Sequence, residues 1–260
     1  MLTGLIIDSL SISVVYILTV LALFFAMEVG YRLNKSLARK TGTPKDEGLG
    51  PIIGATLALL AFSLAFVVSF SANIFNDRRL LVIDEANAIG TTYLRAGYLD
   101  EPQRSKARDL LRMYIGLRID LLESEKRKDA LARSEQIHSD LWEGAEQIAR
   151  ESPSEPTALY ISALNDVIDL HNERISVGLG IRVPPTVLLG LYLVALGTMF
   201  LVGLQSALVE RRNLIALLVL VLILAVVFLL IVDLDRSQDG LLKVPHYALY
   251  ELQRQLNGSP

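Results

Sequence analysis

Residues 52–76 read IIGATLALLAFSLAFVVSFSANIFN, a stretch that contains no charged side chain and no histidine. A helix rises ~1.5 Å per residue, so this stretch is long enough to cross a hydrocarbon layer of ~30 Å. Because lipid offers the backbone no hydrogen-bond partner, a spanning segment must be helical. Three further stretches share this composition: Ser9–Met27, Val183–Val209 and Asn213–Val232. The sequence therefore predicts an integral, multi-pass protein of the cell membrane, with the lipid bilayer as its surroundings.

The four spans are separated by a polar region that holds 15 Lys and Arg and 19 Asp and Glu residues. We expect an all-α membrane protein with four transmembrane helices in two pairs, separated by a helical extramembrane domain. Residues 1–76 would hold helices 1 and 2 with their basic connecting loop, and residues 77–182 the helical domain. Residues 183–232 would hold helices 3 and 4, and residues 233–260 an acidic loop and an amphipathic C-terminal helix.

The polar region has a helical period. Apolar residues recur at three- and four-residue steps from Leu110 to Leu121, with Arg112 and Arg118 between them, which predicts one apolar face and one solvated face. A break follows at residues 151–156. There, Ser152 followed by Pro153 suits the start of a helix.

No motif for catalysis is present. The chain has no cysteine, which excludes disulfides and thiolate metal sites. Its three histidines, His138, His171 and His246, are far apart and lack metal-ligand spacing. No phosphate-binding loop and no HExxH helix occurs. We therefore expect neither an enzyme nor a nucleic-acid partner.

The second span carries phenylalanines at a helical spacing. Phe62, Phe66 and Phe70 recur at i, i+4 and i+8 and form one ridge. In one interpretation they pack against neighbouring helices or lipid, and small residues beside them allow close helix contact. In the other, copies of the span surround an axis, and three rings of Phe form a hydrophobic constriction that gates by dewetting.

The second interpretation assigns roles to the polar residues of this segment. The wider parts of the pore would be lined by Ser63, Ser69 and Asn73, and its mouth by Asp77, Arg78 and Arg79. A ring of Asp would concentrate cations and a ring of Arg would concentrate anions. The sequence leaves the ion selectivity open, because the rotation of the helix decides which of them faces the pore.

Three segments carry a family resemblance. The stretch FSANIFNDRRLLVIDEANAIG (residues 70–90), TYLRA (residues 92–96) and DLDRSQDG (residues 233–240) resemble the bestrophin-like domain family. Bestrophins have two helices, a helical insert and two helices, and their oligomeric pore is lined by the second helix. The resemblance implies a homo-oligomer, a pentamer, that conducts ions, with Phe62, Phe66 and Phe70 at the positions of the constriction.

The acidic loop differs from the family pattern. Animal bestrophins carry a long acidic run that binds calcium, and here Asp233, Asp235 and Asp239 stand in its place. Carboxylate oxygens suit Ca²⁺, so calcium is a possible cofactor at these three residues, whereas no other cofactor is expected. Alternatively, Asp235 pairs with Arg236 or caps a helix.

The sequence gives two conflicting orientations. Lys and Arg in the two short loops favour these loops inside and the polar domain outside. Bestrophin topology places the same domain in the cytoplasm.

Asp84, Glu85 and Arg95 are candidates for an interface. Glu85 and Arg95 are too far apart to pair within one helix, where partners are three or four residues apart. A contact between them would bridge different helices or different subunits. The alternative is that these acids are exposed.

We therefore predict an oligomeric ion channel. The competing hypothesis is a non-conducting, membrane-anchored sensor or scaffold whose helical domain binds a partner.

Overall fold

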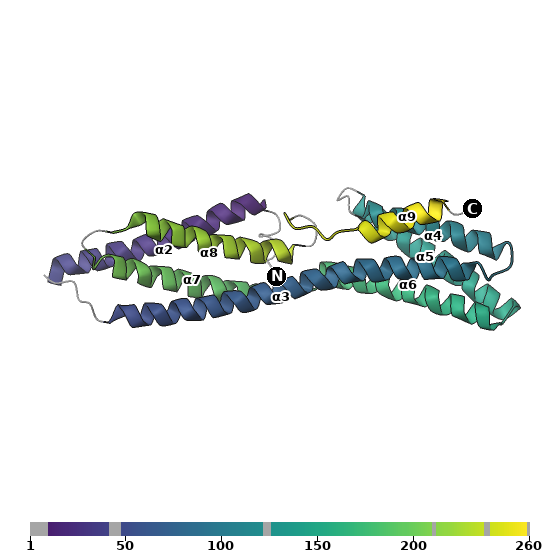
Figure 1. The fold of residues 1–260 in the computed structure, drawn as a ribbon, viewed down its shortest axis with the longest axis horizontal. Coiled ribbons are helices and arrows are strands. Elements are labelled where there is room, and N and C mark those ends of the chain that lie inside the picture. The colour runs from purple at the N-terminus through teal and green to yellow at the C-terminus, as the bar shows by residue number, and fades with distance from the viewer. Residues whose placement is uncertain (1–9, 42–47, 122–125, 210–211, 237–239, 259–260) are drawn as a thin grey trace. The chain divides into compact units, whose positions relative to one another are not determined.

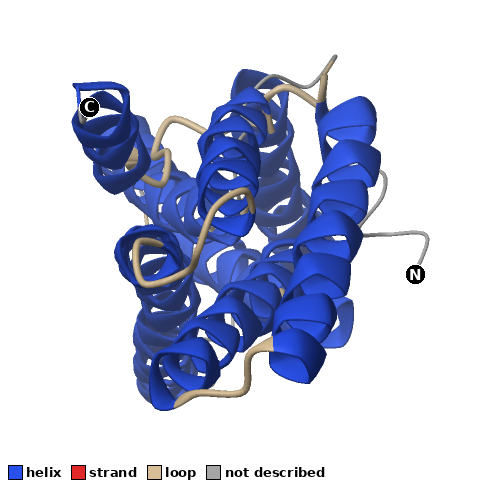
Figure 2. Cartoon of the chain, turned by 90° about the vertical axis from the view of Figure 1, so that its right-hand side faces the viewer, coloured by secondary structure: helices blue, strands red, loops and turns tan. Residues whose placement is uncertain are grey.

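The computed structural model describes residues 10–41, 48–121, 126–209, 212–236 and 240–258. Within these ranges the backbone forms helices joined by loops and no strand (Figure 2). The helices, labelled in Figure 1, are α2 (Ile12–Thr41), α3 (Leu49–Ala96), α4 (Gln103–Asp120), α5 (Arg127–Glu151), α6 (Glu155–Leu179), α7 (Pro185–Ser206), α8 (Leu214–Asp235) and α9 (Tyr247–Gly258). The prediction of an all-helical fold is confirmed.

Four of these helices, α2, α3, α7 and α8, are long and apolar enough to cross a membrane. Helix α3 contains residues 52–76, and each of the other three helices covers most of one predicted stretch. Their arrangement as two successive pairs remains a prediction.

The chain divides into two compact units. The membrane unit comprises Met1–Phe75 and Arg182–Leu242, and the polar unit comprises Asn76–Ile181 and Lys243–Pro260. Helix α3 belongs to both, because it continues without interruption past the apolar span.

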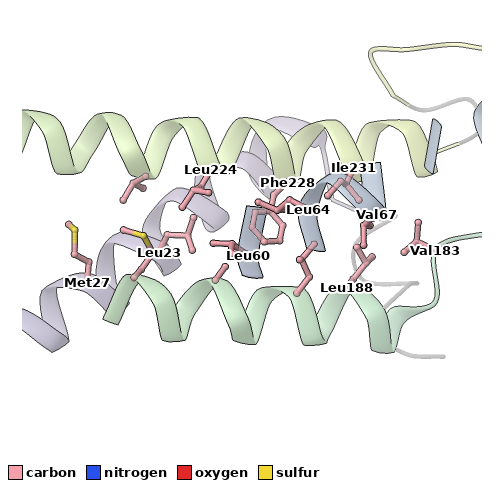
Figure 3. Packing of buried hydrophobic residues seen from close by; sticks show 14 residues of the cluster. Leu23, Met27, Leu60, Leu64, Val67, Val183, Leu188, Leu224, Phe228 and Ile231 are labelled. Carbon is pink, nitrogen blue, oxygen red and sulfur yellow. The ribbon is translucent and has the colours of Figure 1, made fainter. Parts of the chain in front are cut away.

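The membrane unit is held together by an apolar core. Helix α2 lies against α7 and α8 (Figure 1). Figure 3 shows Leu23 and Met27 of α2, Leu60 and Leu64 of α3, and Phe228 of α8 within one cluster of buried side chains. Because lipid is as apolar as these residues, close packing rather than the hydrophobic effect stabilises this contact.

Two glycines allow α2 and α7 to approach closely. A Cβ at Gly203 would overlap the carbonyl oxygen of Met27, and a Cβ at Gly30 would overlap that of Phe200. Nearby, the hydroxyls of Thr19 and Tyr192 are hydrogen-bonded at 2.8 Å. Small residues at a helix crossing are typical of membrane helices, and here any side chain at Gly203 would force the two backbones apart.

In the polar unit, α5 packs against α4 and α6, and α9 packs against α4. Leu110, Tyr114 and Leu121 are buried, as their period predicts. The prediction is wrong for Arg118, which we expected on the solvated face and which is 1% exposed. The reason is a buried carboxylate from another helix, described below.

The start of α6 also differs from its prediction. The helix begins at Glu155, and Ser154 rather than Ser152 caps it by accepting a hydrogen bond from the amide of Thr157 at 3.3 Å. Pro156 then occupies the first turn, where a missing amide proton costs nothing.

Candidate functional site

The three phenylalanines of the α3 span form an exposed ridge. Phe62 is 73% exposed within a single chain, Phe66 65% and Phe70 41%. The opposite side of the same helix is buried, with Leu64 and Val67 in the core of the membrane unit (Figure 3). The helix therefore presents its aromatic face away from the core of its own chain.

Polar residues continue this ridge along the helix. Each phenylalanine is followed seven residues later by a polar side chain, in the order Ser69, Asn73 and Asp77. Seven residues make about two helical turns, so each pair lies on the same side of α3. All three polar residues are exposed, whereas Ser63 is half-buried.

A hollow lies beside the ridge. It has a volume of about 250 Å³ and is lined by Phe62, Ser63 and Phe66 of α3 and by residues of α7 that include Val187 and Leu191. Because this space adjoins both rings, they are not fully packed within one chain.

The three charged residues after the span differ in their surroundings. Asp77 and Arg79 are exposed. Arg78 is 5% exposed, and its Nη2 donates to the carbonyl oxygen of Ile181 at 2.8 Å. Arg78 is therefore held inside the polar unit and is not directed to solvent.

Glu85 lies at the centre of a buried polar cluster. Its side chain is fully buried and forms ion pairs with Arg118 of α4, at 2.7 Å from Nε to Oε1, and with Arg174 of α6. The hydroxyl of Tyr114 donates to Oε1 of Glu85 at 3.0 Å. Glu85 thus connects α3 to α4 and α6 within one chain.

The predicted pairing of Glu85 with Arg95 is wrong. Nη1 of Arg95 donates instead to the carbonyl oxygen of Leu159 at 2.8 Å, and Asp84 is exposed. Glu85 instead bridges α3 to α4 and α6 through Arg118 and Arg174. Its partners are arginines that no local pattern relates to it.

Asp233 and Asp235, expected in an acidic loop, lie in the last turn of α8 and accept hydrogen bonds from backbone amides. Asp233 accepts hydrogen bonds from the amides of Leu241 and Leu242, at 2.6 and 3.0 Å. Asp235 accepts one from the amide of Val183 at 2.8 Å. Asp239 lies outside the described residues, and among the described ones no three His, Asp or Glu side chains gather as metal ligands would. The calcium site remains a prediction.

Comparison with known proteins gives one family. The description of the matching family is Bestrophin-like domain, and the match extends over residues 17–249. The chain belongs to the bestrophin-like family. No curated protein matches it.

The bestrophin-like chain also resembles a solved structure, that of a mutated bacterial bestrophin homologue from Klebsiella pneumoniae. The TM-score is 0.63 at 17% sequence identity, and the match covers 95% of this chain and 99% of that one. Identity this low shows a shared fold alone. Family and fold together support a helical membrane protein.

Proposed function

We propose that this bestrophin-like protein is one subunit of a homo-oligomeric ion channel of the cell membrane, with a pore lined by α3. The observation that carries the proposal is the exposed ridge of Phe62, Phe66 and Phe70, continued on the same side by Asn73 and Asp77. Membership of the family and the fold of the bacterial homologue support a channel kind of function.

The composition of the ridge distinguishes it from a surface that faces lipid. The exposed residues of α8 include Ile215, Val219 and Ile223, which are all aliphatic and suit lipid. On α3, by contrast, a hydroxyl and an amide, those of Ser69 and Asn73, are exposed within the apolar span on the side of the aromatic rings. Polar and charged side chains are costly in hydrocarbon and usually face a protein interior or water. The α3 ridge therefore suits a water-filled axis with a constriction formed by phenylalanine.

A constriction of this kind requires several copies of the chain. One helix presents one ridge, and only a closed ring of copies encloses a path. Rings of phenylalanine would hold back water until the pore widens, which is gating by dewetting. The resemblance to bestrophins implies a ring of five copies of the chain.

The geometry of α3 also favours cations. Asp77 follows Phe70 by two turns and shares its face. Arg78 is bonded to Ile181, and Arg79 lies two residues further along, on roughly the opposite side of the helix. A ring of Asp77 carboxylates at the mouth would therefore concentrate cations.

Ion flux into liposomes that contain the purified protein tests the pore. Replacing Phe62, Phe66 and Phe70 together by Ala should raise the flux severalfold, because the constriction widens. Phe25→Ala is the matched control, since Phe25 is an equally exposed phenylalanine on α2. An unchanged flux in the triple variant would contradict a pore on α3. A wild-type protein that conducts nothing would favour the sensor or scaffold.

The same liposomes test the selectivity. Asp77→Asn should reduce the preference for cations and shift the reversal potential in a salt gradient, whereas Arg79→Gln should leave it close to wild type. If Arg79→Gln produces the larger shift, the assignment of Asp77 to the pore face is wrong.

A further inference from the structure

All three histidines of the chain lie around the Glu85 cluster. Nδ1 of His171 lies 3.1 Å from Nη1 of Arg118, and the rings of His138 and His171 meet edge to face with centroids 4.6 Å apart. Nε2 of His246 lies 3.5 Å from Nη2 of Arg174. The histidines come from α5, from α6 and from the segment before α9, so the cluster joins distant parts of the polar unit.

The two central histidines are enclosed by protein. His171 is 1% exposed and His138 is 8% exposed, and the Nε2 atom of each is buried without a hydrogen-bond partner. The described groups that face them are Glu85 of α3, Tyr114 and Arg118 of α4, and Arg174 of α6. Two of these groups are positive and one is an acid, so the cluster already has an excess of positive charge.

The contact with Arg118 requires a neutral His171. A guanidinium is always protonated and can only donate, so Nδ1 of His171 accepts from Arg118 in the neutral tautomer that carries its proton on Nε2. The same Nδ1 lies 3.1 Å from the hydroxyl of Tyr114, whose own proton is donated to Glu85. A proton on Nδ1 would convert this acceptor into a donor that faces another donor. It would also place a second positive charge at 3.1 Å from the first. Protonated His171 and Arg118 cannot keep this contact.

We propose that the histidines make the polar unit an acid-sensitive latch, in which proton uptake by His171 and His138 separates His171 from Arg118 and loosens the hold of α4 and α6 on Glu85. The latch acts on α3, the helix that carries Glu85. It concerns the packing of the polar unit and does not rest on the proposed channel function.

The protonation energetics agree with this geometry. Burial, together with the charge of Arg118, lowers the pKa of His138 to about 4 and that of His171 to about 3. Burial and the charge of Arg174 lower the pKa of His246 to about 4. The unfolded chain takes up these protons near pH 6.5 and the folded unit does not, so stability is lost as the pH falls below about 6.5.

The fluorescence of Trp142 provides a local readout. It is the only tryptophan of the chain and lies on α5 within the polar unit. We would follow chemical unfolding of the full-length protein in lipid nanodiscs by this signal between pH 8 and 4. Below about pH 6 the unfolding equilibrium constant should rise by up to roughly tenfold per pH unit for each histidine that must take up a proton.

Two variants test the mechanism. His171→Asn retains an acceptor near Nδ1 but takes up no proton, so it should fold at pH 7.5 and reduce the pH dependence by about one proton. His138→Asn should remove about one more. Asp84→Asn, an exposed change beside Glu85, should keep the wild-type pH dependence. An undiminished pH dependence in the double histidine variant would overturn the proposal.

A direct measurement is decisive if a variant fails to fold. In wild-type protein labelled at histidine, NMR should show His138 and His171 neutral at pH 6 and charged only as the unit opens. If both titrate near pH 6.5 while Trp142 still reports a folded unit, there is no latch.

Discussion

Glu85 shows how one residue determines the packing of the polar unit. A carboxylate with no exposed surface is stable only when it is paired, and here it lies between Arg118 and Arg174. Removing one member of such a group leaves the others buried without compensation, which costs about 3–5 kcal/mol.

Glu85→Ala should therefore lower the free energy of unfolding of the polar unit by about 3–5 kcal/mol, as measured by chemical denaturation with Trp142 fluorescence. Asp84→Ala is the matched control, because it removes an exposed carboxylate and should change stability by less than about 0.5 kcal/mol. Equal stability of the two variants would mean that the Glu85 pairs contribute nothing to folding.

The sequence marked Glu85 as a candidate interface residue, with an exposed acid as the alternative, and did not predict its partners Arg118 and Arg174. Glu85 and Arg174 are 89 positions apart, and Tyr114 and Glu85 are 29 apart. Helical periodicity relates residues within one helix and carries no information on which residue of another helix lies opposite. For the same reason the sequence shows no relation between the three histidines and predicts a solvated Arg118.

At the scale of elements, local patterns were more informative. The spacing of Phe62, Phe66 and Phe70 predicted one shared ridge, and they form one, because three residues at four-residue steps on a straight helix must share a face. The packing of α9 against α4 could not be predicted. An amphipathic stripe indicates that the apolar face of a helix is buried, but it does not indicate which other helix buries it.

The crossing of α2 and α7 gives a test at this scale. Gly203→Ala should destabilise the membrane unit by about 1–3 kcal/mol or more, because its methyl group would overlap the backbone of Met27. Gly197→Ala, on the same helix with open space around it, should have little effect. Thermal unfolding in detergent compares the two variants. Similar melting temperatures would show that α2 and α7 tolerate a wider separation.

At the scale of the whole molecule, the aromatic ridge of α3 is exposed in a single chain. Phe62 and Phe66 adjoin an open hollow, and the polar residues that follow them have no covering element among the described residues of their own subunit. The family match and the similar bacterial fold concern the chain alone. The channel proposal therefore depends on what surrounds α3 in the assembled protein.

Electron microscopy of the purified protein in lipid nanodiscs would test this most directly. We predict a closed ring of subunits with α3 nearest the symmetry axis and with Phe62, Phe66 and Phe70 of every copy directed at that axis. A monomer, a dimer without an axial path, or a ring in which the three phenylalanines contact lipid would contradict the account.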